Sequence, residues 1–281
     1  MKKAFVGFDV GGTNIEAGLV SEQGKILALF SHPAQTNKGK KQIAQNTIKV
    51  LEKLLTPDIK CLGICLAWPS PANMPLTISE IKKIISQKYK CPVFFENDAN
   101  LFTLTEALRG QGKKHKTVVG VTLGTGVGCG VVDNKKIFNG RGEASEFGHV
   151  SLNFDGPKCV CGNKGCFEEY AGSRALKRLA KKYKLTAKNG QELYNLARQG
   201  NKKALKLWQE FGKYLGIGLT SITNAYDPDV IILGGQISKA YKYFDKAMKQ
   251  EIKTKALLKP PIIKVSKFKN AAIAAAAFAS K

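Results

Sequence analysis

Three cysteines and a histidine lie within one short, glycine-containing stretch of the chain. Cys159 and Cys161 are separated by a single residue, and Cys166 follows a Gly-Asn-Lys-Gly segment. This segment predicts a turn that brings Cys166 back beside the other two thiols, and we expect His149, ten residues before Cys159, to lie on a strand and supply a fourth ligand. Three thiolates and one imidazole make a closed ligand set, which is typical of a structural Zn2+ site. A disulfide and unreactive buried thiols are the alternatives, although Cys-x-Cys pairs make strained disulfides.

Two glutamates flank this loop. Glu146 lies three residues before His149, and Glu168 lies two residues after Cys166. A metal in the loop would hold both carboxylates at one wall of a pocket, where they can accept hydrogen bonds from the neutral hydroxyls of a sugar. Either glutamate alone fits a solvated surface position. The pair around one metal loop favours a binding site.

The N-terminal residues predict a β-hairpin with a carboxylate beside its turn. Residues 4–9 form an apolar strand that ends in Asp9, and residues 15–20 resume the strand pattern after Gly11-Gly12-Thr13. Glycines leave backbone N–H groups open to a phosphate that approaches closely. Because Mg2+ prefers oxygen ligands, Asp9 is a candidate for the metal side of a nucleotide.

A second turn of the same character, Gly124-Thr125-Gly126, lies between apolar runs at 118–121 and 131–132. Each turn alone is a weak signal, but two of them about one domain apart predict a nucleotide held between two lobes. The sequence contains no Gly-x-x-x-x-Gly-Lys-Ser/Thr motif, and neither turn opens directly into a helix. The Walker and Rossmann modes of phosphate binding are therefore excluded.

Asn97 and Asp98 connect an apolar strand at 93–95 to a predicted helix through Leu108. An acidic residue at this place is by default a helix N-cap. The two phosphate turns favour a different role, because a hydroxyl that attacks a phosphoryl group needs a carboxylate to accept its proton. Asp98 is the candidate for that base.

Together these motifs resemble the ROK family (repressors, open reading frames and sugar kinases) in order and approximate spacing over nearly the whole chain. The segments that carry the resemblance are Asp9–Thr13, Asn97-Asp98, Gly124–Gly126, Glu146–His149, Cys159–Glu168 and Tyr226–Gly235. The resemblance implies an α/β, two-lobe actin-like ATPase (ribonuclease H-like) fold with a structural zinc loop. ATP, Mg2+ and a hexose are then expected to meet between the lobes of a homodimeric enzyme.

The resemblance also implies a role for each site residue. Asp98 is the base, His149 binds zinc through one ring nitrogen and faces the sugar with the other, and the hexose contacts are Asn97, Glu146, His149 and Glu168. The nucleotide contacts are Asp9, Gly11, Gly12, Thr13, Gly124, Thr125, Gly126, Gly234 and Gly235. Two segments depart from the family pattern: Trp68-Pro69-Ser70-Pro71 replaces a Pro-Gly turn, and residues 72–91 are shorter than usual. Both bear on the choice of sugar.

The length of 281 residues fits about two domains. We expect an N-terminal α/β lobe at 1–110 and a C-terminal α/β lobe at 111–281, with a final helix at 270–280 that packs back on the first lobe. Amphipathic helices at 43–55, 192–198 and 205–222 alternate with apolar strands, as in α/β proteins.

The lack of a recognisable targeting signal and the pattern of cysteines favour a cytoplasmic protein. No apolar run is long enough for a membrane span, and we see no secretory signal. Outside the zinc loop, Cys61, Cys65, Cys91 and Cys129 lie in apolar strand contexts, where we expect them to act as small hydrophobic residues.

The net charge of +24 raises the alternative of a nucleic-acid-binding protein. Arginine occurs only five times, however, and scattered lysine is typical of a solvated surface rather than of specific recognition. Sugar-responsive repressors of the family carry an N-terminal helix-turn-helix module, for which a strand that begins at residue 4 is expected to leave no room. We therefore expect an ATP-dependent hexose kinase that acts on the 6-hydroxyl, with glucose as substrate. An N-acetylglucosamine or N-acetylmannosamine kinase, a fructokinase and a non-catalytic sugar sensor are the alternatives.

Overall fold

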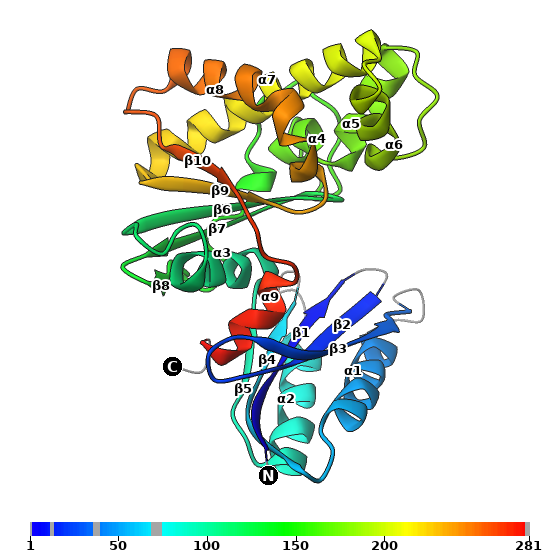
Figure 1. Ribbon diagram of the computed structural model, residues 1–281, viewed down its shortest axis with the longest axis vertical. Coiled ribbons are helices and arrows are strands. Elements are labelled where there is room, and N and C mark those ends of the chain that lie inside the picture. Colours follow the sequence, from blue (N-terminus) through cyan, green and yellow to red (C-terminus); the bar gives the residue numbers. More distant parts are fainter. Residues whose placement is uncertain (1, 12–13, 36–39, 69–74, 279–281) are drawn as a thin grey trace. The chain divides into compact units, whose positions relative to one another are not determined.

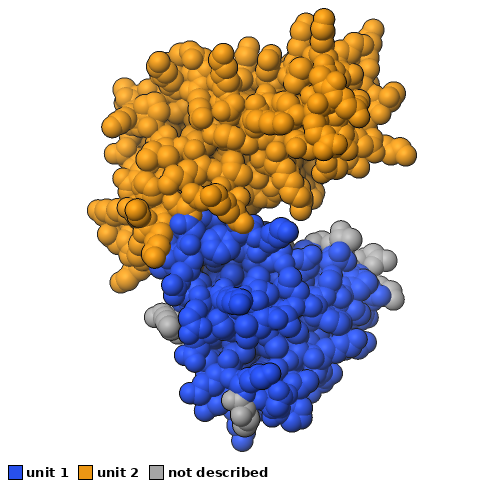
Figure 2. Space-filling model, viewed as in Figure 1, with its two compact units in different colours: residues 1–110, 139–144, 268–281 blue, residues 111–138, 145–267 orange. Residues whose placement is uncertain are grey.

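The computed structural model describes residues 2–11, 14–35, 40–68 and 75–278. The chain divides into two compact units (Figure 2). Unit 1 comprises Met1–Gly110, Asn139–Ala144 and Phe268–Lys281, and unit 2 comprises Gln111–Phe138 and Ser145–Lys267. The chain thus crosses between the units four times, including a short return at 139–144.

Unit 1 is built on a five-stranded sheet of order β3-β2-β1-β4-β5 (Figure 1). The hairpin partners β1, β2 and β3 are antiparallel, whereas β1, β4 and β5 are parallel. The strands are β1 (Lys2–Val10), β2 (Asn14–Val20), β3 (Ile26–Pro33), β4 (Ile59–Ala67) and β5 (Val93–Glu96). The helices are α1 (Lys40–Leu54), α2 (Pro75–Tyr89), α3 (Asp98–Arg109) and α9 (Ala271–Ala274), the last followed by the 3-10 turn η5 (Ala275–Ala277).

Both faces of the central strands in unit 1 are buried. Helices α1 and α2 cover one face (Figure 1), where Leu51 of α1 and Ile81 of α2 pack with Phe8 and Leu66 of the sheet. On the other face, Phe5 joins a cluster that includes residues of α3, α9 and η5. The near-continuous apolar sequence of β1 follows from this two-sided burial, which is typical of a central strand.

Unit 2 repeats the strand arrangement of unit 1, with the order β10-β9-β6-β7-β8. The neighbours β6, β7 and β8 are antiparallel, and β6, β9 and β10 are parallel. The strands are β6 (Thr117–Leu123), β7 (Val127–Asp133), β8 (Lys136–Ile137), β9 (Val230–Gly234) and β10 (Ile262–Val265). The helices are α4 (Phe167–Ala171), α5 (Ser173–Lys182), α6 (Gly190–Arg198), α7 (Lys202–Tyr226) and α8 (Tyr241–Lys255), with 3-10 turns η3 (Phe147–His149) and η4 (Ile237–Ala240).

Helices α7 and α8 pack side by side over one face of the second sheet (Figure 1). Trp208 and Phe211 of α7 contact Phe244 of α8, with ring centroids 6.0 and 5.4 Å apart respectively. Asn201 begins α7 as its N-cap, where its side-chain oxygen accepts hydrogen bonds from the amides of residues 203 and 204. Among the described residues, no helix combines the length and the apolar composition that a membrane span requires.

Candidate active site and metal centre

The carboxyl ends of three parallel strands meet at one edge of the sheet in unit 1. The register pairs Asp9 of β1 with Ala67 of β4, and Ala67 with Glu96 of β5. Ligands of open α/β sheets bind outside this edge. The strand order therefore places Asp9 and the start of α3, which closely follows Glu96, at the same end of the sheet.

Two carboxylates at this edge interact electrostatically. Burial, the charge of Asp98 and the charge of Glu16 raise the pKa of Asp9 from 3.8 to about 6. Burial also raises the pKa of Asp98, although the amide of Ala99 donates a hydrogen bond of 2.8 Å to its Oδ1. Both side chains thus lie where a negative charge is costly, which is typical of functional carboxylates.

Asn97, and not Asp98, is the N-cap of α3. Its Oδ1 accepts hydrogen bonds from the amides of Ala99 and Asn100 at 2.8 and 3.2 Å. This cap satisfies the first amides of the helix and leaves the Asp98 carboxylate to the first turn.

Glu96 organises the residues around this cap. Its Oε1 accepts hydrogen bonds from the Asn97 amide at 2.9 Å and the Asn100 side chain at 3.0 Å. Asn139, in the short return of the chain to unit 1, donates to Glu96 Oε2 at 3.5 Å. The end of β5 is therefore tied to the first turn of α3 and, through Asn139, to one distant segment of the chain.

The predicted phosphate hairpin is present as the antiparallel pair β1–β2, with Asp9 opposite Glu16. At its turn, the Gly11 amide donates to the Asn14 carbonyl at 2.9 Å. Gly12 and Thr13, which we predicted to contact phosphate, lie outside the described residues.

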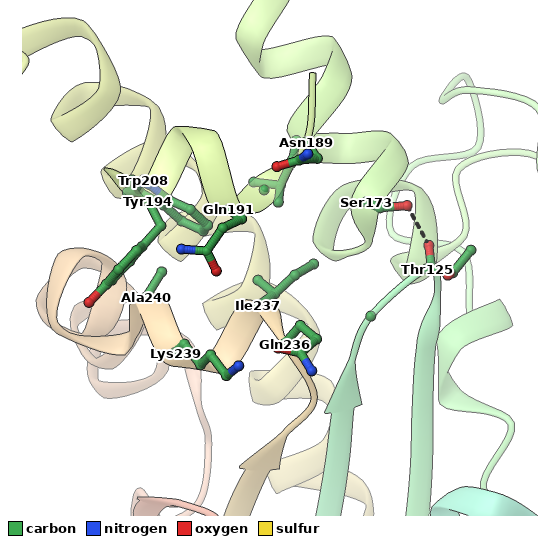
Figure 3. A pocket seen from close by; sticks show the side chains of 13 residues that line it. Thr125, Ser173, Asn189, Gln191, Tyr194, Trp208, Gln236, Ile237, Lys239 and Ala240 are labelled. Carbon is green, nitrogen blue, oxygen red and sulfur yellow. Dashed lines mark hydrogen bonds between the residues drawn. The ribbon is translucent and has the colours of Figure 1, made fainter. Parts of the chain in front are cut away.

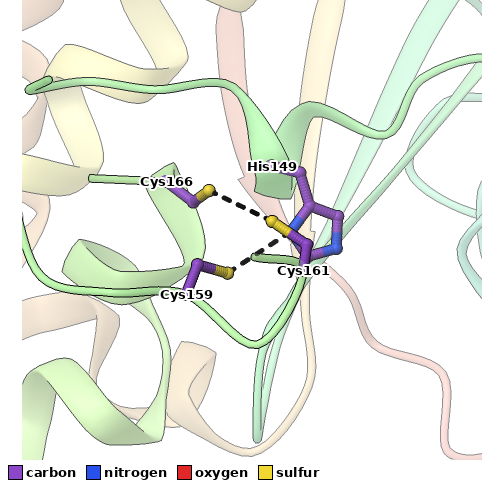
Figure 4. A group of neighbouring side chains, drawn as sticks. All are labelled: His149, Cys159, Cys161 and Cys166. Carbon is purple, nitrogen blue, oxygen red and sulfur yellow. Dashed lines mark hydrogen bonds between the residues drawn. The ribbon is translucent and has the colours of Figure 1, made fainter. Parts of the chain in front are cut away.

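The four predicted metal ligands come together in unit 2 (Figure 4). Cys159 Sγ is 3.7 Å from His149 Nδ1, and Cys161 Sγ is 3.6 Å from Cys166 Sγ. Ligands about 2.3 Å from a tetrahedral Zn2+ lie about 3.7 Å from one another, so the observed spacing fits that ion. His149, Cys159, Cys161 and Cys166 are thus consistent with a zinc site.

Local hydrogen bonds fold the metal loop as predicted. The Cys159 amide donates to Asn163 at 2.8 Å, and Gly162 donates back to Cys159 at 3.1 Å. The prediction that His149 lies on a strand is wrong, because His149 ends the 3-10 turn η3, in which its amide donates to the Glu146 carbonyl at 3.0 Å. Just after His149, the described residues pair in one isolated bridge, Ser151 with Cys166.

Glu168 links the metal loop to the second glycine turn. Its Oε2 accepts a hydrogen bond from the Val127 amide at 3.3 Å, and a side chain at Gly126 would collide with the same oxygen. Arg174 of α5 pairs with Glu168 and also with Glu169, at 2.6 Å from Nε to Oε1. The Glu168 side chain is only 13% exposed, so its carboxylate is held in one place by these partners.

Glu146 lies at the start of η3 and is exposed. Burial raises the pKa of Cys129 on β7 to about 12, and the charge of Glu146 adds to this increase. The Glu146 carboxylate therefore lies near β7, in the same unit as Glu168 and the metal ligands.

A cavity of about 340 Å³ opens beside the second glycine turn (Figure 3). Its walls combine apolar and aromatic groups with amide and hydroxyl groups and one lysine. The lining residues are Gly124, Thr125, Ser173, Leu176, Asn189, Gly190, Gln191, Tyr194, Trp208, Gln236, Ile237, Lys239 and Ala240. Apolar walls with a few polar groups are typical of a site for a small organic ligand.

The backbone at this cavity is fixed by tight local packing. Ser173 Oγ donates to the Thr125 carbonyl at 3.0 Å, which ties the start of α5 to the turn (Figure 3). Gly234 ends β9, and Gly235 has a φ of 80°, with its Cα against the Leu123 backbone of β6. Only glycine fits this left-handed, closely packed position.

Sequence reasoning missed several residues of these sites. Arg174, Glu96 and Asn139 belong to no short motif, and most of the cavity wall comes from α5, α6 and η4, which carry no local chemical signal. Trp68, which begins a segment that departs from the family pattern, is only 2% exposed and packs in the core against Phe95.

Two α/β units with the same order of three antiparallel and two parallel strands, together with glycine turns at the strand ends, define a two-lobe protein of the actin-like ATPase class. The predicted fold class is therefore confirmed. The chain belongs to the ROK family, whose sequence model matches residues 5–279.

Curated relatives include both regulators and enzymes. A xylose repressor of Bacillus subtilis is 39% identical over 178 residues, which cover 63% of this chain and 46% of the repressor. A glucokinase of Thermotoga maritima is 33% identical over 270 residues, covering 85% of this chain and 84% of that enzyme. An N-acetyl-D-glucosamine kinase of Histophilus somni is 32% identical over 291 residues, covering 94% of each.

Solved structures agree with this assignment. The ROK family glucokinase of Streptomyces griseus, in complex with glucose and AMPPNP, is 28% identical and superposes with a TM-score of 0.81 over 98% of both chains. The family thus contains proteins of this fold that bind a sugar and an ATP analogue together.

Proposed function

We propose that this chain is an ATP-dependent hexose kinase that phosphorylates the 6-hydroxyl, with glucose as its preferred substrate. The observation that carries the proposal is the pair of electrostatically interacting carboxylates, Asp9 and Asp98, at the carboxyl edge of the first sheet. Keeping two carboxylates out of water at this edge costs free energy. Phosphoryl transfer gives each of them a role, whereas sugar binding alone does not need both.

In the proposed reaction Asp98 accepts the proton of the attacking hydroxyl. Its raised pKa makes the carboxylate a better proton acceptor than an exposed aspartate. Asp9 faces the phosphates, where bound Mg2+ would neutralise their charge. Glu146, His149 and Glu168 of unit 2 orient the sugar ring, and exclusion of water from the bound sugar removes a competing acceptor.

The nucleotide is proposed to occupy the cavity beside Gly124–Gly126. The base lies among Tyr194, Ile237 and the amide side chains, and the glycine turn and Lys239 face the phosphates. Gly11, Gly12 and Thr13 are the phosphate contacts proposed for unit 1, and Gly234 and Gly235 lie on the adenosine side. This arrangement assigns a physical role to the turn that Ser173 and Glu168 hold.

Zinc is proposed to position the sugar rather than to take part in phosphoryl transfer. His149 Nδ1 faces Cys159, which leaves Nε2 for a sugar hydroxyl. A metal-bound imidazole has a fixed tautomer and ring plane, so its second nitrogen recognises a hydroxyl with defined geometry.

The sugar preference follows from the groups around the metal loop and from the segment at 72–91. The two carboxylates suit the hydroxyls of an unsubstituted ring, and a shortened segment at 72–91 leaves fewer contacts to reject other hexoses. We expect glucose first and other 6-hydroxyl hexoses within roughly 10–200-fold in kcat/KM, the range that one small contact provides.

Steady-state kinetics with ATP and a sugar panel tests the proposal. The panel contains glucose, mannose, fructose, N-acetylglucosamine and N-acetylmannosamine, and the expected order begins with glucose. A strong preference for an N-acetylated sugar would replace glucose by the second candidate, an N-acetylhexosamine kinase, which the N-acetyl-D-glucosamine kinase relative favours.

A sugar sensor without catalysis is the candidate from another class, and the xylose repressor relatives favour it. Calorimetry that detects sugar binding, combined with no phosphorylated sugar after prolonged incubation with ATP and Mg2+, would establish the sensor and exclude the kinase.

A further inference from the structure

Two cysteines outside the candidate active site lie side by side in unit 1. Cys61 is on β4, and Cys91 lies between α2 and β5. Their Sγ atoms are 3.1 Å apart, so that one thiol can donate a hydrogen bond to the other. Cys91 is buried, whereas Cys61 is partly exposed and gives a small solute access to the pair.

A β-bulge turns Cys61 toward Cys91. Ala4 pairs with Cys61 but Phe5 pairs with Gly63, so Leu62 is an extra residue in β4. An extra residue reverses the face to which later side chains point. Cys61 therefore packs with the cluster that contains Cys91, whereas Cys65 lies in the cluster on the opposite face.

The end of α2 completes the arrangement. Lys90 adopts a left-handed conformation, with a φ of 50°, and its amide donates to the Ser86 carbonyl at 3.0 Å. This residue ends the helix and turns the chain back toward β4. The hydroxyl of the adjacent Tyr89 is buried and has no hydrogen-bond partner among the described residues.

Electrostatics distinguishes the two thiols. The hydrogen bond from Cys61 lowers the pKa of Cys91, and the same bond together with burial raises that of Cys61. Cys91 is therefore the thiol of the pair that ionises more readily, and Cys61 is the one that keeps its proton. A thiolate is the nucleophilic form of cysteine.

We infer that Cys61 and Cys91 form an oxidisable dithiol that hydrogen peroxide converts into an intramolecular disulfide. The Cys91 thiolate attacks one peroxide oxygen, the O–O bond breaks, and the hydroxide that leaves takes up a proton to form water. The resulting Cys91 sulfenic acid is attacked by the Cys61 sulfur, which loses its proton, and the S–O bond breaks with release of a second water. Two thiols are oxidised to one disulfide, and one peroxide is reduced to two waters.

The disulfide would tie β4 to the junction of α2 and β5. It closes a loop that contains the rest of β4 and all of α2, and such a closure disfavours the unfolded chain. The pair lies near the amino end of β4, whereas Asp98 follows the carboxyl end of β5. Oxidation is therefore expected to change the stability of unit 1, and this inference does not depend on the proposed kinase activity.

Mass spectrometry of the zinc-loaded protein tests the inference. After a stoichiometric amount of hydrogen peroxide, alkylation and digestion should reveal the peptides of Cys61 and Cys91 joined, and dithiothreitol should separate them. The melting temperature should rise by roughly 5 °C or more and return on reduction. Zinc content, measured before and after, shows whether Cys159, Cys161 and Cys166 remained bound.

Three variants distinguish this pair from general oxidation. Cys65→Ser, on the same strand but the opposite face, should form the disulfide as the unmodified protein does. Cys61→Ser should lose the disulfide and leave a Cys91 sulfenic acid that dimedone traps, and Cys91→Ser should lose both products. Free thiols at both positions after peroxide treatment, or a disulfide with any other cysteine, would overturn the inference.

Discussion

Replacing Asp9 by asparagine should stabilise the protein at neutral pH while it removes the proposed phosphate-side carboxylate. The pKa of Asp9 in the folded protein is about 6, against 3.8 for an unperturbed aspartate. A difference of about 2 pH units corresponds to about 3 kcal/mol of folding free energy. Because the folded-state pKa is raised, this contribution is fully present below pH 3.8 and is lost as the pH rises through about 6.

The amide introduced by Asp9→Asn cannot ionise, so the variant should not lose this contribution. The difference in unfolding free energy between Asp9→Asn and the unmodified protein should grow by about 2–3 kcal/mol from pH 4 to pH 7.5. Urea unfolding without Mg2+ and nucleotide measures it, and fluorescence can be restricted to unit 1. The sequence has two tryptophans, and in a Trp208→Phe background Trp68 reports on unit 1 alone.

A control variant should show the same pH dependence of the unfolding free energy as the unmodified protein. Glu22→Gln, which removes an exposed carboxylate from the turn between β2 and β3, should leave the pH dependence unchanged. If the unfolding free energies of Asp9→Asn and the unmodified protein change in parallel between pH 4 and pH 7.5, ionisation of Asp9 costs no folding free energy. The proposed electrostatic interaction between Asp9 and Asp98 is then absent.

Three further predictions concern unit 2 and its boundary. The purified protein should contain about one zinc per chain, and removal of the zinc by a strong chelator should raise KM for the sugar before it affects nucleotide binding. Metal analysis and KM values check this expectation, and an active protein without zinc would contradict it. Arg174→Met should raise KM for the sugar roughly tenfold with little change in kcat, because the Glu168 carboxylate loses the partner that holds it in place. Arg174→Lys should restore part of the sugar affinity. An equal fall in kcat would instead indicate a role of Arg174 in phosphoryl transfer. Ser145 has a φ of 76° and a buried hydroxyl without a hydrogen-bond partner among the described residues. Ser145→Gly should therefore stabilise the protein by about 1 kcal/mol in urea unfolding, whereas the control Ala144→Gly should not.

Local patterns made the hairpins and the metal loop predictable from the sequence. The β1–β2 and β6–β7 pairs join apolar strands through short glycine turns, so each signal lies within about twenty residues. The metal loop is also local, because Cys159, Cys161 and Cys166 are brought together by one turn. Metal chemistry then restricts the remaining ligand to a nearby side chain such as His149.

Features that depend on tertiary contacts were not predictable in this way. We expect a strand at His149 from the sequence, but the segment forms a 3-10 turn followed by a single isolated bridge. Arg174 and Glu168 pair across the junction of α4 and α5, and Asn139 reaches Glu96 from a different part of the chain. Such pairs have no sequence period, so only the folded chain identifies them.

The central claim is that Asp98 accepts a proton in phosphoryl transfer to a sugar. The most direct measurement is the rate of glucose 6-phosphate formation from glucose and ATP by the unmodified protein and by Asp98→Asn, with glucose affinity measured in parallel. We expect turnover by the unmodified protein, a loss of about 10²–10⁴-fold in kcat in the variant, and nearly unchanged glucose binding. Because the pKa of Asp98 is raised, activity of the unmodified protein should fall as the pH decreases through a value above 3.8. If Asp98→Asn keeps the kcat of the unmodified protein, Asp98 is not the base.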